Sequence, residues 1–328
     1  MKAIQVTQFG GPEVLKMVDI ERPEPGPGQV RIKVAATSVN FADIMARQGR
    51  YHNAGNPPFI PGLDVTGTID AIGPNTEGWQ PGQRVIAFPP NGSYAEYVIA
   101  DAVTTYPIPD TVSVEQAAAF PTVGVTSFEL LSKVVKLQQG ETVVIHAAAG
   151  GIGTTAVQFA KLLGAGLVIG TVSNSEKIAV AKEAGADVVI NYVDDHFSDR
   201  VLEVTDGRGA DVILDSVAGP IFSQSLACLA RFGRIAVFGS SSGAPGHIET
   251  FDLHGSCRSV IGYSMGTTRR YRPEALKPSI ETALSYLANG DLKMRVTASY
   301  SFDEVTAAQN LVESRLSTGK VLLFPPSV

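Results

Sequence analysis

A glycine-rich turn is the first feature of this sequence that suggests chemistry. Residues 148–153, Ala-Ala-Gly-Gly-Ile-Gly, fit the pattern G-x-G-x-x-G with alanine at the first glycine. They follow the apolar segment ETVVIHAA and open the helical pattern TTAVQFAKLLGA (154–165). Gly150 would let a pyrophosphate approach the positive end of a helix that starts near Gly151-Ile152, and Gly153 would let that helix pack closely. The turn predicts dinucleotide binding; a tight turn without a ligand is the alternative.

The end of the next apolar run indicates which dinucleotide is bound. An acidic residue about 20 positions after the turn would accept hydrogen bonds from the ribose and repel a 2′-phosphate. The sequence has Val172 and Ser173 there, with Lys177 close behind. A hydroxyl and an ammonium group attract a phosphate instead. We therefore predict NADPH rather than NADH, with Ser173, Lys177 and Tyr192 around the 2′-phosphate; a solvated helix lysine is the alternative for Lys177.

Later strand ends supply small and hydroxyl-bearing residues along the same sheet edge. The segments are DSVAG (215–219) and FGSSSG (238–243). Each alone is an ordinary turn, but their order along the chain fits one long ligand. The further cofactor candidates are Ser216, Phe238, Gly239, Ser240 and Ser241. Arg315 and Lys320 are additional candidates near the C-terminus, with a solvated helix end as the alternative for both.

The elements that carry these residues fall into two parts. Residues 1 to about 120 are rich in proline and glycine, and segments such as QVRIKVAATSVN (29–40) alternate as half-buried strands do. From 141 to about 240 strands and helices alternate, with strands at 167–172, 187–192, 210–217 and 234–240 and helices at 176–186, 196–204 and 221–231. Helices return at 274–289 and 303–314, and a short strand ends the pattern. The prediction is an α/β protein in which a doubly wound parallel sheet accompanies a mostly β domain.

Composition narrows the functional classes. Across 328 residues, 44% are hydrophobic and 18% charged, which is typical of a globular protein with two cores. A net charge of −6 argues against a nucleic-acid surface, and Arg269, Arg270 and Arg272 are interpreted as a solvated loop. No apolar run reaches the roughly 20 residues of a membrane span, and no signal peptide is recognised. Cys228 and Cys257 are expected to be reduced, buried thiols of a cytoplasmic protein; a disulfide between them is the alternative.

Nearly the whole chain resembles the zinc-free quinone reductases of the medium-chain dehydrogenase/reductase superfamily, the group that includes zeta-crystallin. The resemblance rests on segments that occur in order along the chain: GPEVL (11–15), PxPGPGQVxIKV (23–34), VNFADIMARQGRY (39–51), PFIPGLDVTGTI (58–69), GSYAEY (92–97), HAAAGGIG (146–153), INY (190–192) and SRLSTGKVLL (314–323). It implies a GroES-like catalytic domain of residues 1–121 and 267–328. A Rossmann NADP-binding domain of residues 122–266 would lie between those segments. The resemblance also implies a homodimer that pairs through the strand-like segment 260–265.

The same resemblance bears on metal binding. In the alcohol-dehydrogenase branch a cysteine stands at the position of Asn40, and a His-Glu pair stands at those of Leu63 and Asp64. Leucine cannot bind a metal, and an asparagine amide is a poor zinc ligand. The five histidines are scattered. We therefore expect a protein that works without zinc, in which the aspartate at 64 replaces a more usual glutamate.

The resemblance implies four residues at the nicotinamide end of the site: Asn40, Asp43, Tyr51 and Thr126. Asn40 and Thr126 would bind the carboxamide, the ribose or the substrate oxygen, and Tyr51 would donate a hydrogen bond or proton to the product. For Asp43 the alternative is a helix cap, for Thr126 an ordinary helix position, and for Tyr51 a surface aromatic. His146, inside an apolar strand, is interpreted as a packed core residue.

Three functions remain open from the sequence. Without a metal, hydride delivery is feasible to an acceptor that is already electron-poor. The first hypothesis is an NADPH-dependent quinone reductase. The second is a reductase of α,β-unsaturated carbonyls or enoyl thioesters, which the same active-site segment would serve. The third is a cofactor-binding protein with little turnover, used structurally or for RNA; the acidic charge and the intact polar set count against it.

Overall fold

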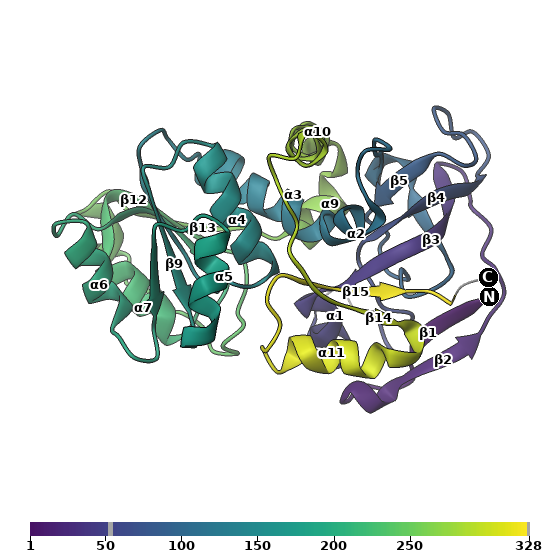
Figure 1. Ribbon diagram of the computed structural model, residues 1–328, viewed down its shortest axis with the longest axis horizontal. Helices are drawn as coiled ribbons and strands as arrows, with labels where there is room; N and C mark the ends of the chain where they lie inside the picture. Colours follow the sequence, from purple (N-terminus) through teal and green to yellow (C-terminus); the bar gives the residue numbers. More distant parts are fainter. Residues whose placement is uncertain (52–54, 327–328) are drawn as a thin grey trace. The chain divides into compact units, whose positions relative to one another are not determined.

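The computed structural model describes residues 1–51 and 55–326 of the chain (Figure 1). Its fold divides into two compact units. One unit consists of Met1–Val125 together with Met265–Val328, and the other is Thr126–Ser264. We refer to them as the β-rich unit and the nucleotide unit.

The nucleotide unit is built on six parallel strands in the order β10-β9-β8-β11-β12-β13. This order places the first strand, β8, beside the fourth, β11, as in a doubly wound dinucleotide-binding sheet, and it confirms the predicted fold class. The strands are β8 (Thr142–Ile145), β9 (Leu167–Val172), β10 (Val188–Asn191), β11 (Ala210–Asp215), β12 (Leu229–Val237) and β13 (Ser259–Gly262).

Helices cover both faces of this sheet, because each parallel crossover returns the chain over one face (Figure 1). Helices α6 and α7 share with the strands one core that includes Val144, Ile169, Phe197 and Ile213. The helical segments are α3 (Pro121–Glu129), which begins in the β-rich unit, η3 (Leu130–Val134), α4 (Gly151–Leu162), η4 (Ser175–Lys177), α5 (Ile178–Glu183), α6 (Phe197–Val204), α7 (Pro220–Ala227) and α8 (Phe251–His254).

One element prediction in this unit was wrong. The helix expected over 221–231 ends with α7, and β12 begins at Leu229. The backbone N–H of Ala210 donates to the carbonyl of Cys228 across 2.9 Å, and Leu229 pairs with Ala210. Leu229 and Ala230 are both buried, and a short buried strand has the same apolar run as a helix that continues. The strand expected at 260–265 is also shorter, since α9 begins at Met265.

The β-rich unit contains a two-stranded sheet, β1-β2, and a seven-stranded sheet in which the long strand β3 pairs with β15, β4 and β6. The strands are β1 (Lys2–Val6), β2 (Leu15–Asp19), β3 (Gln29–Val39), β4 (Val65–Ile72), β5 (Arg84–Ala87), β6 (Tyr97–Asp101), β7 (Thr105–Pro107), β14 (Val296–Ser301) and β15 (Lys320–Phe324).

The helical segments of the β-rich unit come from both ends of the chain. They are η1 (Pro12–Val14), α1 (Phe41–Arg47), η2 (Ala102–Thr104), α2 (Val114–Ala119), α9 (Met265–Tyr271), α10 (Pro273–Asn289), η5 (Phe302–Glu304) and α11 (Val305–Glu313). The buried side chain of Arg47 in α1 donates to Gln309 and Glu313 of α11, across 2.8 and 2.5 Å. This contact fastens the returning C-terminal segment to the N-terminal part of the chain.

The pairing of β3 with β15 determines which residues meet at the end of β3. Val39 lies opposite Val321, so Lys320 at the start of β15 lies beside the residue that follows β3, Asn40. On the other side β3 pairs with β4, where Thr37 lies opposite Val65 and brings Asp64 to the same end of the sheet. Strand register therefore assembles three polar residues that are far apart in sequence.

The structure corrects two interpretations made from the sequence. The segment 269–272 is not a solvated loop throughout, because α9 includes Arg269 and the guanidinium of Arg269 donates to the carbonyl of Leu63 across 2.8 Å. Cys228 is buried as expected, whereas Cys257 is exposed; neither thiol is in a disulfide. Within the described residues, no helix combines the length and apolarity that crossing a membrane requires.

Candidate functional site

The glycine-rich turn joins β8 to α4 at the centre of the nucleotide unit's sheet. Gly150 is extended (φ −80°, ψ −178°) and α4 starts at Gly151. The first N–H groups of such a helix have no partner inside it, and they carry the positive end of its dipole. A Cβ on Gly153 would lie 2.1 Å from the carbonyl oxygen of Ala147, closer than any real contact. The turn therefore requires glycine at 153, and Ile152 lies in the first turn of the helix beside it.

The three residues predicted around a 2′-phosphate follow the neighbouring strands β9 and β10. Asn191 pairs with Val172, and the N–H of Tyr192 donates to the carbonyl of Val172 across 3.1 Å. Ser173 follows Val172 directly. The side chain of Asn174 accepts a hydrogen bond from the N–H of Lys177 at 3.1 Å and starts η4. Ser173, Lys177 and Tyr192 are each half-buried at this edge.

The two later strand ends are joined to each other. The N–H of Ser241 donates to the carbonyl of Ser216 across 3.0 Å, and a Cβ on Gly239 would lie 2.9 Å from the same oxygen. The buried carboxyl of Asp215 accepts the N–H groups of Val217 and Ala218 at 2.7 and 2.9 Å. The predicted set of Ser216, Phe238, Gly239, Ser240 and Ser241 thus lies on two neighbouring loops. Arg315 belongs to the β-rich unit, where it is exposed.

His146 is a core residue, as its place in an apolar strand predicts. Its ring nitrogens lie 2.8 Å from Oγ1 of Thr171 and 2.8 Å from Oγ of Ser225, on β9 and α7. Burial lowers the pKa of His146 to about 4, although the charge of Asp215 opposes that change. The neutral imidazole therefore ties β8 to its neighbours directly before the glycine-rich turn.

In the β-rich unit, a buried polar cluster surrounds Asn40. Nδ2 of Asn40 donates to Oδ2 of Asp64 across 3.1 Å, and Oδ1 of Asn40 accepts from Nζ of Lys320 at 2.7 Å. Asp64 also accepts from the hydroxyl of Ser38 at 2.8 Å and from the N–H of Thr122 at 3.3 Å. Burial lowers the pKa of Lys320, and the carboxylates of Asp64 and Asp43 oppose that shift.

Asp43 is the second carboxyl of this cluster. Its Oδ2 accepts the backbone N–H of Asn40 at 2.8 Å, the return bond of a capping box at the start of α1, so the helix-cap alternative describes part of its role. Oδ2 also accepts from the hydroxyl of Tyr94 at 3.2 Å, and within the described residues Oδ1 has no hydrogen-bond partner. Burial raises the pKa of Asp43 to about 7, while the bond from Asn40 opposes the rise.

Tyr51 and Thr126, the other two predicted catalytic residues, have different surroundings. Tyr51 is half-buried in the β-rich unit, within electrostatic range of Arg269. Burial lowers the pKa of that guanidinium, and its electrostatic interactions with Tyr51, Asp64 and Asp43 oppose the effect. Thr126 is buried in α3 and is assigned to the nucleotide unit; no described residue hydrogen bonds to its Oγ1. Thr126 thus has a hydroxyl available for a ligand.

Sequence reasoning missed most of the residues around Asn40. Lys320, interpreted as a solvated residue or a cofactor contact, is only 3% exposed and is held in strand β15. Tyr94 was not singled out, and Arg269 was assigned to a loop. A signal existed for Lys320, because a single lysine before the apolar run VLLF is unusual at the start of a buried strand. Nothing local in the sequence marks Tyr94.

The donor set at positions 40, 63 and 64 does not suit zinc. Asn40 presents its amide nitrogen to Asp64 and its oxygen to an ammonium group, and Leu63 has no donor atom. A dication beside Lys320 would be repelled, and Asp64 already accepts three hydrogen bonds. In the described part of the chain, no group of three or more His, Cys, Asp or Glu residues is arranged to hold a metal ion.

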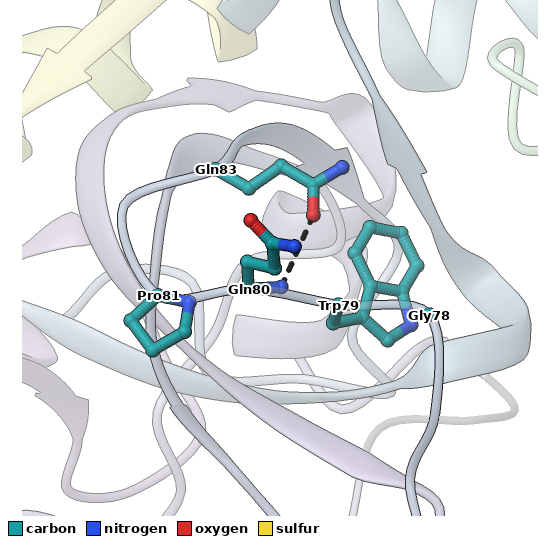
Figure 2. A pocket seen from close by; sticks show the side chains of 5 residues that line it. All are labelled: Gly78, Trp79, Gln80, Pro81 and Gln83. Atoms are coloured by element: carbon teal, nitrogen blue, oxygen red, sulfur yellow. Dashed lines mark hydrogen bonds between the residues drawn. The ribbon is translucent and has the colours of Figure 1, made fainter.

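A separate surface pocket is lined by the loop that joins β4 to β5 (Figure 2). Gly78, Trp79, Gln80, Pro81 and Gln83 line it, and the Gln83 side chain accepts the N–H of Gln80 at 3.3 Å. This pocket contains no ionisable or nucleophilic side chain and none of the predicted site residues. It is therefore not a candidate active site.

Comparisons with known proteins agree with this two-part architecture. Residues 26–110 match the alcohol dehydrogenase GroES-like domain, and residues 151–282 match the zinc-binding dehydrogenase family. A quinone oxidoreductase of Pseudomonas aeruginosa is 35% identical over an aligned length of 328 residues, and the alignment covers 99% of each chain. The structure of Escherichia coli quinone oxidoreductase complexed with NADPH is 32% identical, with a TM-score of 0.93 over 99% of this chain and all of the other. A 2-haloacrylate reductase structure is 30% identical, with a TM-score of 0.88 over the full length of both.

The similarity to quinone oxidoreductases extends through both units. The matches cover 99% of this chain, which takes in both units. The chain belongs to the quinone oxidoreductase family of the medium-chain dehydrogenase/reductase superfamily.

Proposed function

We propose that this chain is an NADPH-dependent quinone reductase that transfers a hydride from the nicotinamide to a quinone without a metal ion. The observation that carries the proposal is the acid-free end of β9. Ser173 directly follows β9, the strand next to β8 and its glycine-rich turn, while Lys177 ends η4 and Tyr192 follows the neighbouring strand β10. The NADPH in the Escherichia coli relative and the names of several relatives support the same assignment.

The residues present suit NADPH. The close approach at Gly153 and the start of α4 form a cradle for a pyrophosphate, with Gly150 allowing the ligand to come close and Gly151 and Ile152 supplying backbone N–H groups. Ser173, Lys177 and Tyr192 would hold the 2′-phosphate. Ser216, Phe238, Gly239, Ser240, Ser241 and Arg315 would hold the rest of the cofactor. The hydroxyl of Thr126, buried and without a described partner, suits a polar group of the ligand.

When bound, NADPH supplies a hydride, and the chain's own residues must provide orientation, exclusion of water and a proton. A quinone that accepts a hydride gains negative charge on oxygen and needs a proton to become a hydroquinone. Tyr51 is the proposed hydrogen-bond or proton donor to that oxygen, and the cation of Arg269 in its neighbourhood favours the anion. Asn40 and Thr126 orient the reactants through their polar atoms. Asp43 fixes the backbone from which Asn40 projects.

The second candidate function is reduction of an activated carbon–carbon double bond. The similarity to a 2-haloacrylate reductase at 30% identity supports it. The same hydride donor and the same tyrosine would serve an α,β-unsaturated carbonyl: hydride addition to the β-carbon leaves an enolate, whose oxygen the tyrosine would hydrogen bond and whose α-carbon then takes a proton. Enoyl thioesters of large carriers fit the structure less well, because such carriers would need a basic entrance. Of the three arginines in 269–272, Arg269 already donates to the carbonyl of Leu63.

We also propose that the protein is a cytoplasmic homodimer that acts on a small molecule. Strand β13 is the last strand on one side of the nucleotide sheet, and its outer edge offers backbone groups to a second copy. Two free thiols suit a reducing compartment. The domain boundaries proposed from the sequence, at 121/122 and 266/267, lie close to the boundaries of the two compact units.

The test is a comparison of four initial rates under identical conditions. NADPH and NADH are each oxidised with a simple quinone and with an α,β-unsaturated ketone as acceptor. Fast loss of the quinone with NADPH, at least about tenfold faster than with NADH, supports the proposal. Turnover with the ketone alone favours the second function. Absence of turnover with every pair points to a cofactor-binding protein, and an NADH preference contradicts the assignment of the β9 end.

A further inference from the structure

Two hydrogen bonds connect Lys320 to Asn40 and Asn40 to Asp64, so that a neutral amide lies between a cation and an anion. The ammonium of Lys320 donates to Oδ1 of Asn40 at 2.7 Å and to the carbonyl of Val39 at 3.1 Å. Nδ2 of Asn40 donates to Asp64 at 3.1 Å. All three side chains are buried, with exposures of 3%, 7% and 0%. Among the described residues no carboxylate lies within ion-pair distance of Lys320, so the amide connects the cation to the anion.

This arrangement allows one orientation of the amide. If the Asn40 side chain were turned over, its NH₂ would face the ammonium and its oxygen would face the carboxylate. Both contacts would be repulsive, because an ammonium group has no acceptor and an ionised carboxylate has no donor. In the observed orientation the two charges also polarise the Asn40 amide in the same direction, and this strengthens both of its hydrogen bonds.

Packing alone does not account for a lysine at position 320. The residues that follow, Val321, Leu322 and Leu323, are buried and apolar, and a methionine would fill a similar space without the desolvation of a charge. A buried cation whose main partner is a neutral amide recovers less of its desolvation free energy than one paired with a carboxylate, so stability alone does not explain it. Its specific effect is to hold Asn40.

We infer that Lys320 is a positioning residue that acts through Asn40: with Asp64 it locks the Asn40 amide in the orientation needed to bind the nicotinamide or the acceptor. The inference rests on the proposed function for its catalytic consequence. The orientation of the amide itself is independent of which acceptor is reduced.

The first test is a double-mutant cycle with Lys320→Met and Asn40→Ala, read as kcat and KM for NADPH and a quinone. Lys320→Met alone should lower kcat/KM by about 10- to 100-fold, the scale of a misplaced active-site group. In the Asn40→Ala background the same change should lower it by less than about twofold, because its effect passes through the amide. Equal losses in both backgrounds would overturn the inference. Lys33→Met, an exposed lysine of β3, is the matched control and should leave both constants unchanged.

The second test needs no turnover. Selective ¹⁵N labelling of asparagine gives side-chain NH₂ signals, and Asn40→Ala identifies that of Asn40. Lys320→Met should shift this signal or exchange-broaden it while Lys33→Met does not; an unchanged signal would contradict the inference. If the wild type reduces no quinone, the proposed function fails while this test still decides the role of Lys320. If Lys320→Met does not fold, Lys320→Gln takes its place, and its neutral NH₂ should restore part of the amide signal.

Discussion

The hydroxyl of Tyr94 donates to the carboxyl of Asp43 across 3.2 Å, and both side chains are almost completely shielded from solvent. Burial raises the pKa of Asp43 to about 7 and raises that of Tyr94 well above its usual value. The tyrosine hydroxyl therefore keeps its proton, and it is the carboxyl that changes its charge near neutral pH. This pair makes the stability of the β-rich unit sensitive to pH.

The first prediction concerns Asp43→Asn. In the unfolded chain Asp43 has an ordinary pKa of about 3.9, so between pH 4 and 7 the folded state holds a proton that the unfolded state releases. This contribution to stability is complete below about pH 4 and is lost as the pH rises through about 7. Asparagine removes it. The free energy of unfolding of wild type should therefore fall, relative to that of Asp43→Asn, by up to about 1.4 kcal/mol per pH unit.

Urea unfolding at half-unit steps from pH 4 to pH 8 measures this difference. Asp303→Asn, at an exposed position in the same unit, is the control and should show no such trend. Parallel curves for wild type and Asp43→Asn would show that the carboxyl titrates at its ordinary pKa.

The second prediction concerns His146→Gln and has the opposite sign. The pKa of His146 is lowered to about 4 in the fold and is near 6.5 when unfolded, so the unfolded state binds the extra proton. The stability is present above about pH 6.5 and is lost as the pH falls towards 4. Glutamine should remove this dependence, and it should also lower the free energy of unfolding at pH 7 by about 1–3 kcal/mol because one hydroxyl loses its partner.

Thermal or urea unfolding of the nucleotide unit across pH 4–7 tests the His146 prediction. His247→Gln is a suitable control because His247 is exposed. A pH trend that survives in His146→Gln would assign the trend to another group.

The fold of the nucleotide unit was predictable because its signals are local. Each strand is an apolar run and each helix has its own periodicity, and the order of the elements leads to a doubly wound sheet. The glycine-rich turn could be recognised for the same reason. The error at 228–231 arose where a buried strand directly follows a helix and both require apolar residues.

The polar cluster around Asn40 was only partly predictable, because strand register assembles it. Lys320 and Asn40 are 280 positions apart, and only the pairing of β15 with β3 brings them together. Tyr94 reaches Asp43 from a position 51 residues away. A single sequence shows the residue types but not this register, so Lys320 was interpreted as a cofactor contact or, alternatively, as part of a solvated helix end. Asn40, Asp43 and Tyr51 were singled out as candidates because the family resemblance includes the continuous segment 39–51.

The third prediction concerns Gly153→Ala. The added methyl group would lie 2.1 Å from the carbonyl oxygen of Ala147 and 2.6 Å from the backbone of Ala148, so the turn or the helix must move. Overpacking of this kind costs about 1–3 kcal/mol of stability. Because the turn is the proposed pyrophosphate site, NADPH affinity should fall by at least about tenfold.

Fluorescence titration with NADPH and thermal unfolding report the two effects of Gly153→Ala separately. Gly255→Ala is the control, since a Cβ at Gly255 meets nothing within 4 Å and its φ of −66° suits alanine. Tight NADPH binding by Gly153→Ala would remove the turn from the cofactor site.

The fourth prediction concerns Lys177→Met. A charge-assisted contact with a phosphate is worth about 1.5–3 kcal/mol, so the KM for NADPH should rise by about 10- to 100-fold. The KM for NADH should stay unchanged because NADH has no 2′-phosphate. Lys182→Met, an exposed lysine of α5, is the control and should alter neither constant. Equal changes for the two cofactors would show that Lys177 supports the fold and does not distinguish the phosphate.

The fifth prediction concerns Tyr51→Phe, which removes a hydroxyl and keeps the ring. If this hydroxyl donates to the oxygen that becomes negative after hydride transfer, kcat with a quinone should fall by about 100-fold, while the dissociation constant for NADPH stays within about twofold. Tyr271→Phe is the control: Tyr271 ends α9, is 70% exposed and loses the same atom. Stopped-flow measurement of a single hydride transfer should show the loss in the chemical step. A fall in NADPH affinity with an unchanged single-turnover rate would instead make Tyr51 a cofactor contact, and the proton donor would then have to be sought among the other groups that surround Arg269.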